Sequence, residues 1–251
     1  MHLNDFKTFI NNAFGNLVEQ FDENDEYGFN NPLSKKINRV GFTTNLTPDV
    51  ISKAVDKNVQ LIITHHDAWD FLYGMKEQCV KLLEENDISH FYIHLPLDFA
   101  EFGTCNSLLK EIEVSKIIQQ THFKENREII GIGEYNESIT FEELVGKVAS
   151  KLGEDVKAWK NSTSPIRKVG VITGAGNSTA LIKQAKEAGC DAYITGEKSL
   201  YSVQYAKFIG LNHIVGSHTF TEVFGVKTLV EKLKKEFSEI ESIYLEEEHL
   251  E

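Results

Sequence analysis

Two adjacent histidines, His65 and His66, follow directly after an apolar stretch rich in β-branched residues. This stretch, 59–64, is typical of a buried strand, and open α/β folds bind their ligands beyond the carboxyl ends of such strands. Neutral imidazole is a common metal ligand. The pair on its own indicates either a metal site or a structural pair of hydrogen-bonded histidines, and other residues must decide between the two.

Two further pairs of an imidazole and a carboxylate follow strand-like runs. His94 is followed four residues later by Asp98, across a turn that contains Pro96. His218 is followed four residues later by Glu222, and a helix that begins here would place both on one face. Mixed imidazole and carboxylate ligands suit zinc, manganese, iron, cobalt or nickel better than calcium.

These five residues, His65, His66, Asp98, His218 and Glu222, exceed the four ligands of a closed tetrahedral zinc site. If one carboxylate bridges two ions, the set can hold a pair of ions roughly 3.5–4 Å apart, as in two-metal hydrolytic centres. Water on the open positions of such ions has a lowered pKa and provides a hydroxide near neutral pH. The residue types therefore suit metal-dependent hydrolysis.

The elements that must position these residues form two similar series. Strands are expected in the first series at 37–44, 59–64 and 89–95, with helices at 47–55 and 77–85. Strands are expected in the second series at 169–173, 191–195 and 211–218, with helices at 180–188 and 219–235. Glu197 follows the strand 191–195 of the second series, at the place that the histidine pair occupies after the strand 59–64 of the first series. We interpret this as an internal duplication, with α/β halves at 1–123 and 124–251.

The remaining segments complete this α/β pattern. Apolar residues recur at helical spacing over 3–21, and the polar stretch 22–36 is expected to be a loop. The spacing of Thr140 and Glu143 matches a capping box that opens a helix through 152. Another helix is expected at 105–113, and further strands at 127–134 and 242–245.

Four motifs together resemble the NIF3-like family, also called the dinuclear metal centre or GTP cyclohydrolase type 2 homologue family. They cover nearly the whole chain and are the histidine pair after its strand, His94-Leu-Pro-Leu-Asp98, Asp191-Ala-Tyr-Ile-Thr-Gly-Glu197 and Gly216-Ser-His218 with Glu222. The resemblance implies a NIF3-like fold of two related α/β halves, with the metal site at strand carboxyl ends between them. It also implies a ring-shaped homohexamer assembled from trimers.

The same resemblance implies specific roles for the five residues. His66 and Asp98 are expected to bind one divalent ion, His65 and His218 the other, and Glu222 to bridge both. The resemblance assigns no catalytic residue. His94 either binds metal or orients Asp98 or a bound water, so its role stays open.

The sequence departs from the family pattern at several positions. Asp67 stands where a proline usually follows the histidine pair, and the segment after His94 differs from the usual Thr-Asn-Leu-Asp. The early Trp-Asp-Asn stretch is not recognisable around 25–28. These changes concern substrate contacts more than metal binding, and Asp67 either joins the site or caps the segment that follows it. The chain is also too short for the domain that some relatives insert between the halves.

Two other candidates remain open. Glu197 is either a general base or a structural acid at a strand end. The turn 174–178, Gly-Ala-Gly-Asn-Ser, either cradles a phosphate at a helix start or is a plain tight turn, because it lacks the spacing of a phosphate-binding loop.

Composition excludes several classes of function. Asp and Glu exceed Lys and Arg by 38 to 26, a net charge of −12, and no basic block breaks this excess, so nucleic-acid binding is not expected. No segment has the pattern of a secretory signal or a membrane span. The widely spaced cysteines, Cys79, Cys105 and Cys190, are typical of buried thiols in a cytoplasmic protein.

The sequence therefore predicts a cytoplasmic metal-dependent hydrolase of a small nucleotide-like or phosphate-containing substrate. GTP cyclohydrolase activity is implied only by the name of the relatives. The alternative is a non-catalytic metal-binding interaction or regulatory protein, which the same ligand set would also serve.

Overall fold

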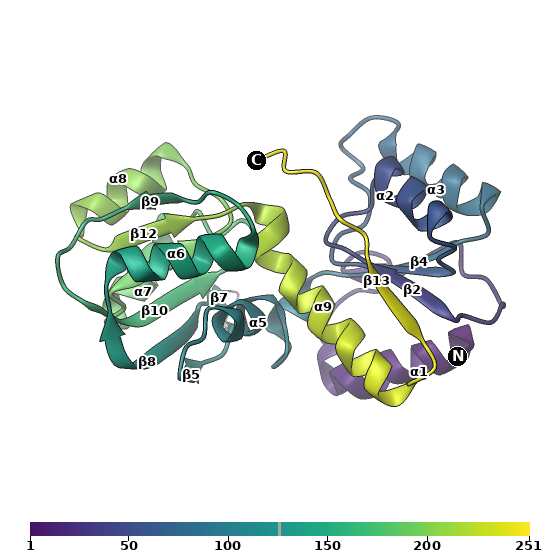
Figure 1. Cartoon of the computed structure of the whole chain (residues 1–251), viewed down its shortest axis with the longest axis horizontal. Helices are drawn as coiled ribbons and strands as arrows, with labels where there is room; N and C mark the ends of the chain where they lie inside the picture. Colours follow the sequence, from purple (N-terminus) through teal and green to yellow (C-terminus); the bar gives the residue numbers. More distant parts are fainter. Residues whose placement is uncertain (125–126) are drawn as a thin grey trace. The chain divides into compact units, whose positions relative to one another are not determined.

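The chain forms two compact units of mixed α/β structure, described here in a computed structural model that covers residues 1–124 and 127–251 (Figure 1). The first unit comprises Met1–Ala100 and Val226–Leu250, and the second comprises Glu101–Gly225 with Glu251. This division differs from the expected halves 1–123 and 124–251, because the chain returns to the first unit after residue 225. The long helix α9 (His218–Glu236) begins in the second unit and ends in the first.

The first unit is built on a five-stranded sheet in the order β1-β4-β3-β2-β13. Strands β13, β2, β3 and β4 run parallel to one another, and β1 pairs antiparallel with β4. Its strands are β1 (Tyr27–Asn30), β2 (Arg39–Phe42), β3 (Leu61–Thr64), β4 (Ser89–Ile93) and β13 (Glu241–Tyr244). Its helices are α1 (Leu3–Phe14), the 3-10 helix η1 (Gly15–Gln20), α2 (Pro48–Asp56), α3 (Met75–Glu85) and α4 (Leu95–Phe99), together with the end of α9.

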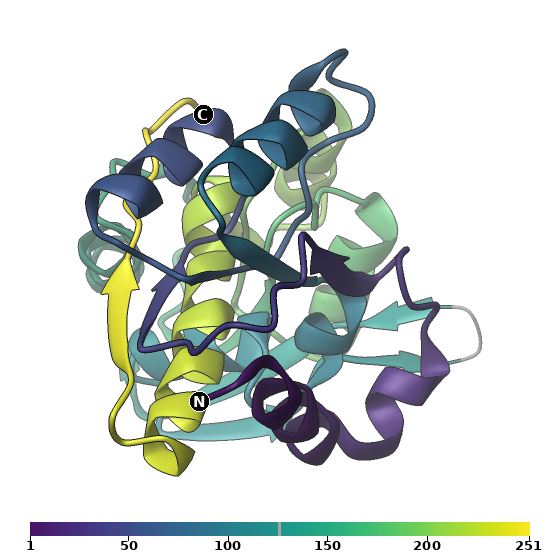
Figure 2. The ribbon, with the colours of Figure 1, turned by 90° about the vertical axis from the view of Figure 1, so that its right-hand side faces the viewer.

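Helices cover both faces of this sheet, as Figure 2 shows. On one face, α2 and α3 bury their apolar residues against β3 in a cluster that includes Val50, Ile62 and Leu83. On the other face, Phe6 of α1 meets the ring of Phe91 edge-on at 5.1 Å. Thr47 caps the start of helix α2, because its side chain accepts a hydrogen bond from the main-chain N–H of Val50.

The second unit is built on a six-stranded sheet in the order β5-β8-β10-β11-β12-β9. Strands β10, β11 and β12 are parallel, whereas β8 and β9 pair antiparallel with β10 and β12 at the two sides of this parallel core. Its strands are β5 (Lys116–Gln119), β8 (Gly131–Ile139), β9 (Lys157–Trp159), β10 (Ile166–Ile172), β11 (Ala192–Thr195) and β12 (Asn212–Val215), and the separate pair is β6 (His122–Lys124) with β7 (Arg127–Ile129). Its helices are α5 (Thr104–Glu111), α6 (Phe141–Leu152), α7 (Thr179–Glu187), α8 (Leu200–Phe208) and the start of α9.

The parallel cores of the two units share one connectivity, as the duplication hypothesis predicts. The first runs β2, α2, β3, α3, β4, and the second runs β10, α7, β11, α8, β12. The likeness extends to single residues, because His90 and His213 each occupy the second position of the last core strand. Burial lowers the pKa of each to about 4, so both are neutral core residues.

Three local expectations are corrected by the structure. The expected loop 22–36 contains the edge strand β1, and the turn after His94 is the short helix α4. The expected strand 127–134 is divided between β7 and β8, and β8 continues to Ile139. Helix α8 was not expected, because its sequence exposes Leu200, Tyr201 and Phe208 and so lacks a clear apolar face.

Candidate metal centre

The first unit brings three histidines together at the carboxyl ends of β3 and β4. His65 and His66 are buried, and their N–H groups both donate to the carbonyl oxygen of Thr44, at 3.0 and 2.9 Å. His94 follows β4, whose register places the end of β4 beside the end of β3. The ring of His94 lies 5.1 Å from the ring of His65 and 5.2 Å from that of His66. Each histidine offers a ring nitrogen within 4.8 Å of the others, so the cluster could hold a metal ion.

The Nδ1 atom of each of these histidines faces an oxygen acceptor. The partner of Nδ1 is the carbonyl oxygen of Ile93 for His65 (2.9 Å), the amide oxygen of Asn45 for His66 (2.8 Å) and a carboxylate oxygen of Glu26 for His94 (2.8 Å). An oxygen of these kinds accepts a hydrogen bond, so Nδ1 carries the proton and Nε2 carries the lone pair. This arrangement is the one that metal-binding histidines usually have.

Asp98 belongs to the same cluster. It lies on α4, one helical turn after His94, and its Oδ1 atom is 3.4 Å from Nε2 of His65. Its Oδ2 atom is 4.0 Å from Nε2 of His94. The helix therefore directs a carboxylate toward the same ring nitrogens that carry the lone pairs.

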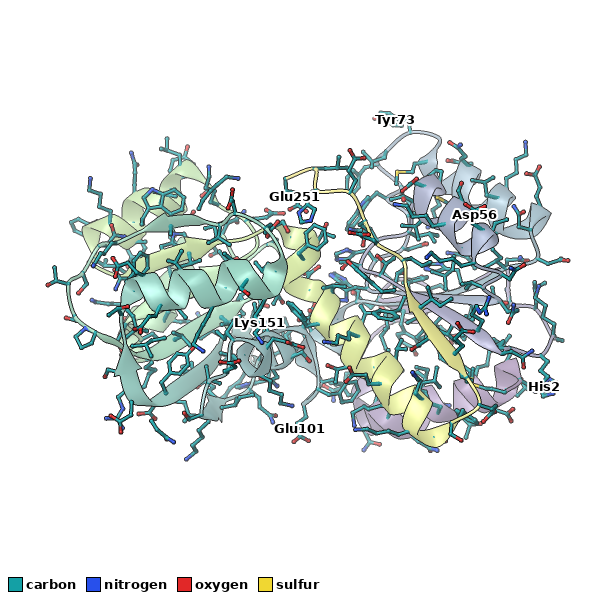
Figure 3. The ribbon with its side chains drawn as sticks, in the orientation of Figure 1. His2, Asp56, Tyr73, Glu101, Lys151 and Glu251 are labelled. Atoms are coloured by element: carbon teal, nitrogen blue, oxygen red, sulfur yellow. The ribbon has the colours of Figure 1, made fainter. Side chains whose placement is uncertain are left out.

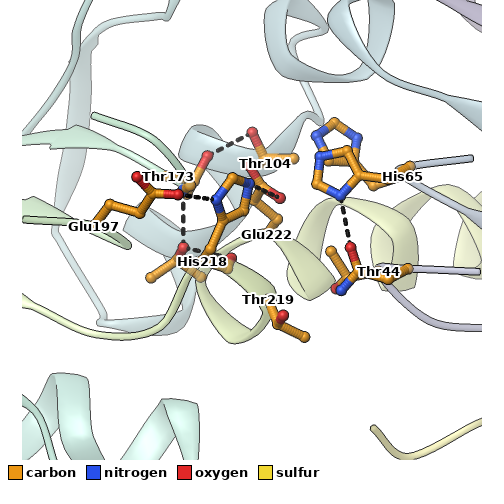
Figure 4. A network of polar contacts seen from close by, with 12 residues as sticks. Thr44, His65, Thr104, Thr173, Glu197, His218, Thr219 and Glu222 are labelled. Atoms are coloured by element: carbon orange, nitrogen blue, oxygen red, sulfur yellow. Dashed lines mark hydrogen bonds and ion pairs between the residues drawn. The ribbon is translucent and has the colours of Figure 1, made fainter. Parts of the chain in front are cut away.

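The second unit contains a similar, smaller arrangement at the start of α9 (Figure 4). Nε2 of His218 lies 3.2 Å from Oε2 of Glu222, and Nδ1 of His218 lies 2.7 Å from Oε1 of Glu197. Burial alone would lower the pKa of His218, but the hydrogen bonds and charges of Glu222 and Glu197 raise it to about 10. In the absence of metal this imidazole is therefore a cation between two carboxylates.

Gly174 leaves the space that these side chains occupy. It has a φ of +58°, and a Cβ atom built there would lie 2.0 Å from Oε1 of Glu222 and 2.9 Å from Nε2 of His218. The N–H group of Gly174 donates to the Oγ1 atom of Thr221, one helical position before Glu222 (3.0 Å). Gly174 thus leaves room for the side chains of the first turn of α9 and also holds this turn through a hydrogen bond.

Glu197 has the contacts of a supporting residue. One of its carboxylate oxygens is bound to His218, and the other accepts a hydrogen bond from Nδ2 of Asn177 at 2.9 Å. Its place beside His218 matches that of Glu26 beside His94. The turn 174–178 contributes Asn177 to this contact, and Ser178 caps α7 by accepting a hydrogen bond from the N–H of Ala180 at 3.1 Å.

Asp67, which stands where the family pattern has a proline, binds other residues of the first unit. Its carboxylate accepts hydrogen bonds from Nδ2 of Asn30 at 2.7 Å and from the N–H of Ala68 at 2.8 Å, and it pairs with Lys76 at 3.1 Å. These contacts anchor the loop 67–74, whose tip carries the fully exposed Tyr73 (Figure 3).

A cavity of about 190 Å³ opens beside the histidines of the first unit. It is lined by His66 and His94 and by the aromatic rings of Trp69 and Tyr92. The ring of Trp69 lies 4.6 Å from the ring of His66. Burial and the charge of Asp67 raise the pKa of Tyr92 to about 12, so its hydroxyl group is a hydrogen-bond donor at neutral pH. The cavity therefore joins an aromatic face to the imidazole cluster.

Each expected site residue thus takes a defined place. His65, His66 and Asp98 lie together in the first unit, with His94, and His218 and Glu222 lie together in the second. Sequence reasoning missed Glu26 and Asn45, which hold two of the imidazoles. Glu26 lies in the stretch that was expected to be a loop, and nothing in the local sequence of Asn45 signals its role.

The chain is similar to known proteins over nearly its whole length. A family model described as Duf34/NIF3 (NGG1p interacting factor 3) matches residues 1–249. A Haemophilus influenzae protein named "GTP cyclohydrolase 1 type 2 homolog" is 33% identical over 195 residues, which cover 75% of this chain and 76% of that protein. A Pseudomonas aeruginosa protein of the same name is 29% identical over 219 residues, 84% of each chain.

Solved structures have the same fold. A crystal structure of a Thermus thermophilus protein has a TM-score of 0.83 at 19% identity and covers 100% of both chains. The structure of a Bacillus cereus protein related to NIF3 has a TM-score of 0.80 at 15% identity and covers 100% of this chain and 98% of that one. Among the helices of the described residues, none is long and apolar enough to cross a membrane.

Proposed function

The chain belongs to the Duf34/NIF3 family, and from this premise we propose that it binds two divalent transition-metal ions and hydrolyses a small nucleotide-like or phosphate-containing substrate. One observation carries the proposal: His65, His66, His94 and His218 all hold Nδ1 against an oxygen atom. A ring nitrogen held by an oxygen acceptor is the usual state of a metal-binding histidine, and these four histidines share it within the clusters that also hold Asp98 and Glu222.

We assign the ligands according to the family resemblance. His66 and Asp98 would bind one ion, His65 and His218 would bind the other, and Glu222 would bind both. The contacts of Asp98 in the first unit and of Glu222 in the second support this assignment, because each carboxylate lies within 3.4 Å of an imidazole Nε2 atom. The mixed nitrogen and oxygen donors fit zinc, manganese, iron, cobalt or nickel.

The chain's own residues would prepare the site for hydrolysis. When bound, such ions lower the pKa of coordinated water and so supply hydroxide near neutral pH. Glu197 orients His218, and Glu26 orients His94. A molecule bound in the cavity beside His66 would lie next to the imidazoles, and the ring of Trp69 at its wall would offer a face for the stacking of a planar base. This supports a nucleotide-like substrate, of which GTP is the first to test.

We further propose that the protein is a cytoplasmic homohexamer. The proposal follows the resemblance. The buried cysteines Cys79 and Cys190 lie outside any disulfide, as is usual for proteins of a reducing compartment. Light scattering of the purified protein should give six times the chain mass of 28.4 kDa, and a monomeric mass would contradict the hexamer.

Elemental analysis of the purified protein tests the metal proposal. The native chain should carry two transition-metal ions, and Glu222→Ala should lose them. Glu231→Ala is the matched control, because Glu231 is an exposed residue of the same helix. Native protein that takes up no ion after reloading with zinc, manganese, iron, cobalt or nickel would refute the proposal.

A substrate screen with metal-loaded protein then tests hydrolysis. Turnover that disappears in Glu222→Ala and persists in Glu231→Ala would support the hydrolase. Two bound ions without turnover of GTP, other nucleotides or phosphate esters would instead favour a metal-binding interaction protein.

A further inference from the structure

The segment that follows β13 carries a carboxylate held against the turn between β2 and α2. Oε1 of Glu247 accepts hydrogen bonds from Oγ1 of Thr43 (2.5 Å), the N–H of Thr44 (2.8 Å) and the N–H of Asn45 (3.0 Å). Oε2 of Glu247 accepts a fourth from Nδ2 of Asn45, at 2.8 Å. These four donors hold an ionised carboxylate in one place and one orientation.

The carboxylate decides which way the Asn45 amide faces. An ionised carboxylate only accepts hydrogen bonds, so the Asn45 group beside Oε2 of Glu247 must be the NH₂ group. The amide oxygen then points the other way, where Oδ1 lies 2.8 Å from Nδ1 of His66. Since an amide oxygen also only accepts, Nδ1 of His66 carries the proton and Nε2 carries the lone pair.

We propose that Glu247 is a positioning residue that sets the tautomer of His66 through Asn45. The inference rests on the proposed metal-binding function, because the tautomer of His66 matters when Nε2 binds an ion. The acceptors beside Nδ1 of His65 and His94 are a main-chain carbonyl and a carboxylate, which cannot become donors by rotation. The acceptor beside His66 is the amide of Asn45, which becomes a donor when it turns over. Of these three histidines, His66 is therefore the one whose acceptor must be held in orientation by a further residue.

Strand pairing brings Glu247 to this turn across 202 positions of sequence. β13 pairs in parallel with β2, and the N–H of Leu245 donates to the carbonyl oxygen of Phe42 at 2.9 Å. The chain therefore leaves β13 beside the residues that follow β2. The pairing of the edge strand β13 therefore lets Glu247 orient Asn45, the hydrogen-bond partner of the proposed metal ligand His66, although Glu247 lies far from both in the sequence.

We call the hydrogen bonds that link Glu247, Asn45 and His66 the relay. Glu247→Gln should reverse the direction of these hydrogen bonds with almost no change in the shape of the side chain. The introduced amide oxygen can accept from the three donors that Oε1 now binds, and its NH₂ group then takes the place of Oε2. Two NH₂ groups cannot face each other, so the Asn45 amide turns over and presents its own NH₂ group to Nδ1 of His66. Nδ1 must then accept, and the proton moves to Nε2.

The tautomer is measured directly in the metal-free chain. Long-range ¹H–¹⁵N correlation spectra distinguish a protonated Nδ1 from a protonated Nε2 in each histidine. We expect the proton of His66 on Nδ1 in the native chain and on Nε2 in Glu247→Gln. The affinity for cobalt or zinc should fall about 10–100-fold, as when other supporting contacts of metal ligands are lost.

A second substitution should restore the relay. Adding Asn45→Asp to Glu247→Gln gives the introduced NH₂ group a carboxylate oxygen to bind, and the other carboxylate oxygen again accepts from Nδ1 of His66. The double variant should recover both the tautomer and the metal affinity, which a merely structural role of Glu247 would not explain. Glu246→Gln is the control, because it removes the same charge from an exposed neighbouring residue and should change neither.

Two results would overturn the relay. One is a native spectrum with the proton of His66 on Nε2, and the other is an unchanged tautomer in Glu247→Gln. Neither depends on bound metal. A native chain that binds no ion would instead refute the proposed function and leave the tautomer result standing, so the two failures are distinguishable.

Discussion

The substitution Gly174→Ala tests most directly whether Glu222 and His218, the proposed ligands of the second unit, bind metal in their present positions. Gly174→Ala would place Cβ 2.0 Å from Oε1 of Glu222 and 2.9 Å from Nε2 of His218, whereas real Cβ atoms essentially never approach another heavy atom within 3.0 Å. Both side chains must therefore move away from their present positions. The alanine must also adopt a φ of +58°, which costs about 1–2 kcal/mol for a residue with a Cβ atom.

Gly153→Ala separates the backbone cost from the steric effect. Gly153 ends α6 with a φ of +72°, and nothing lies within 4 Å of a Cβ atom built there. Gly153→Ala should lose about 1–2 kcal/mol of unfolding free energy in urea, because it requires a left-handed alanine, and Gly174→Ala should lose at least as much, because it also displaces two side chains. Only Gly174→Ala should also weaken the binding of cobalt or zinc, by about 100-fold or more, because it displaces two proposed ligands and the loss of a supporting contact alone costs about 10–100-fold.

Isothermal titration of the metal-free proteins measures this difference. The native chain and Gly153→Ala should bind metal with the same affinity. If Gly174→Ala also bound metal with native affinity and stoichiometry, then Glu222 and His218 would not be ligands in the positions described here, and the reasoning would fail.

Three further predictions concern other parts of the chain. Thr140→Ala removes the side chain that caps α6, so the unfolding free energy in urea should fall by about 1 kcal/mol, and an unchanged value would contradict the cap. Because the pKa of His218 is raised from 6.5 to about 10, its contribution to the stability of the metal-free protein should be complete below pH 6.5 and lost as the pH rises through about 10. This loss should be absent from His218→Gln, and an equal loss would refute the carboxylate contacts. Cobalt bound at His66 should quench the fluorescence of Trp69, measured in Trp159→Phe, and unquenched emission would place the ion elsewhere.

Much of the candidate metal centre could be predicted, because its residues follow buried strands. The apolar runs that end at His65 and His94 are local patterns, and parallel strands bring their carboxyl ends to one edge of a sheet. The helical spacing of His218 and Glu222 is likewise a local property. The sequence therefore indicated which side chains gather within each unit.

The supporting contacts could not be predicted, because they depend on the pairing of distant segments. Glu26 reaches His94 only because the edge strand β1 pairs with β4, and its polar sequence resembles a loop. Glu247 reaches Asn45 only because the chain returns to the first sheet as β13. A helix such as α8, with several apolar residues exposed, gives no periodic signal at all.

A crystal structure of the cobalt-loaded protein, with anomalous scattering at the cobalt edge, tests the central claim most directly. The account predicts two cobalt ions per chain, one bound by Nε2 of His66 and by Asp98, the other by Nε2 of His65 and of His218, with Glu222 bridging them. Coordination through any Nδ1 atom, or a cobalt-loaded crystal without ions at these residues, would contradict it.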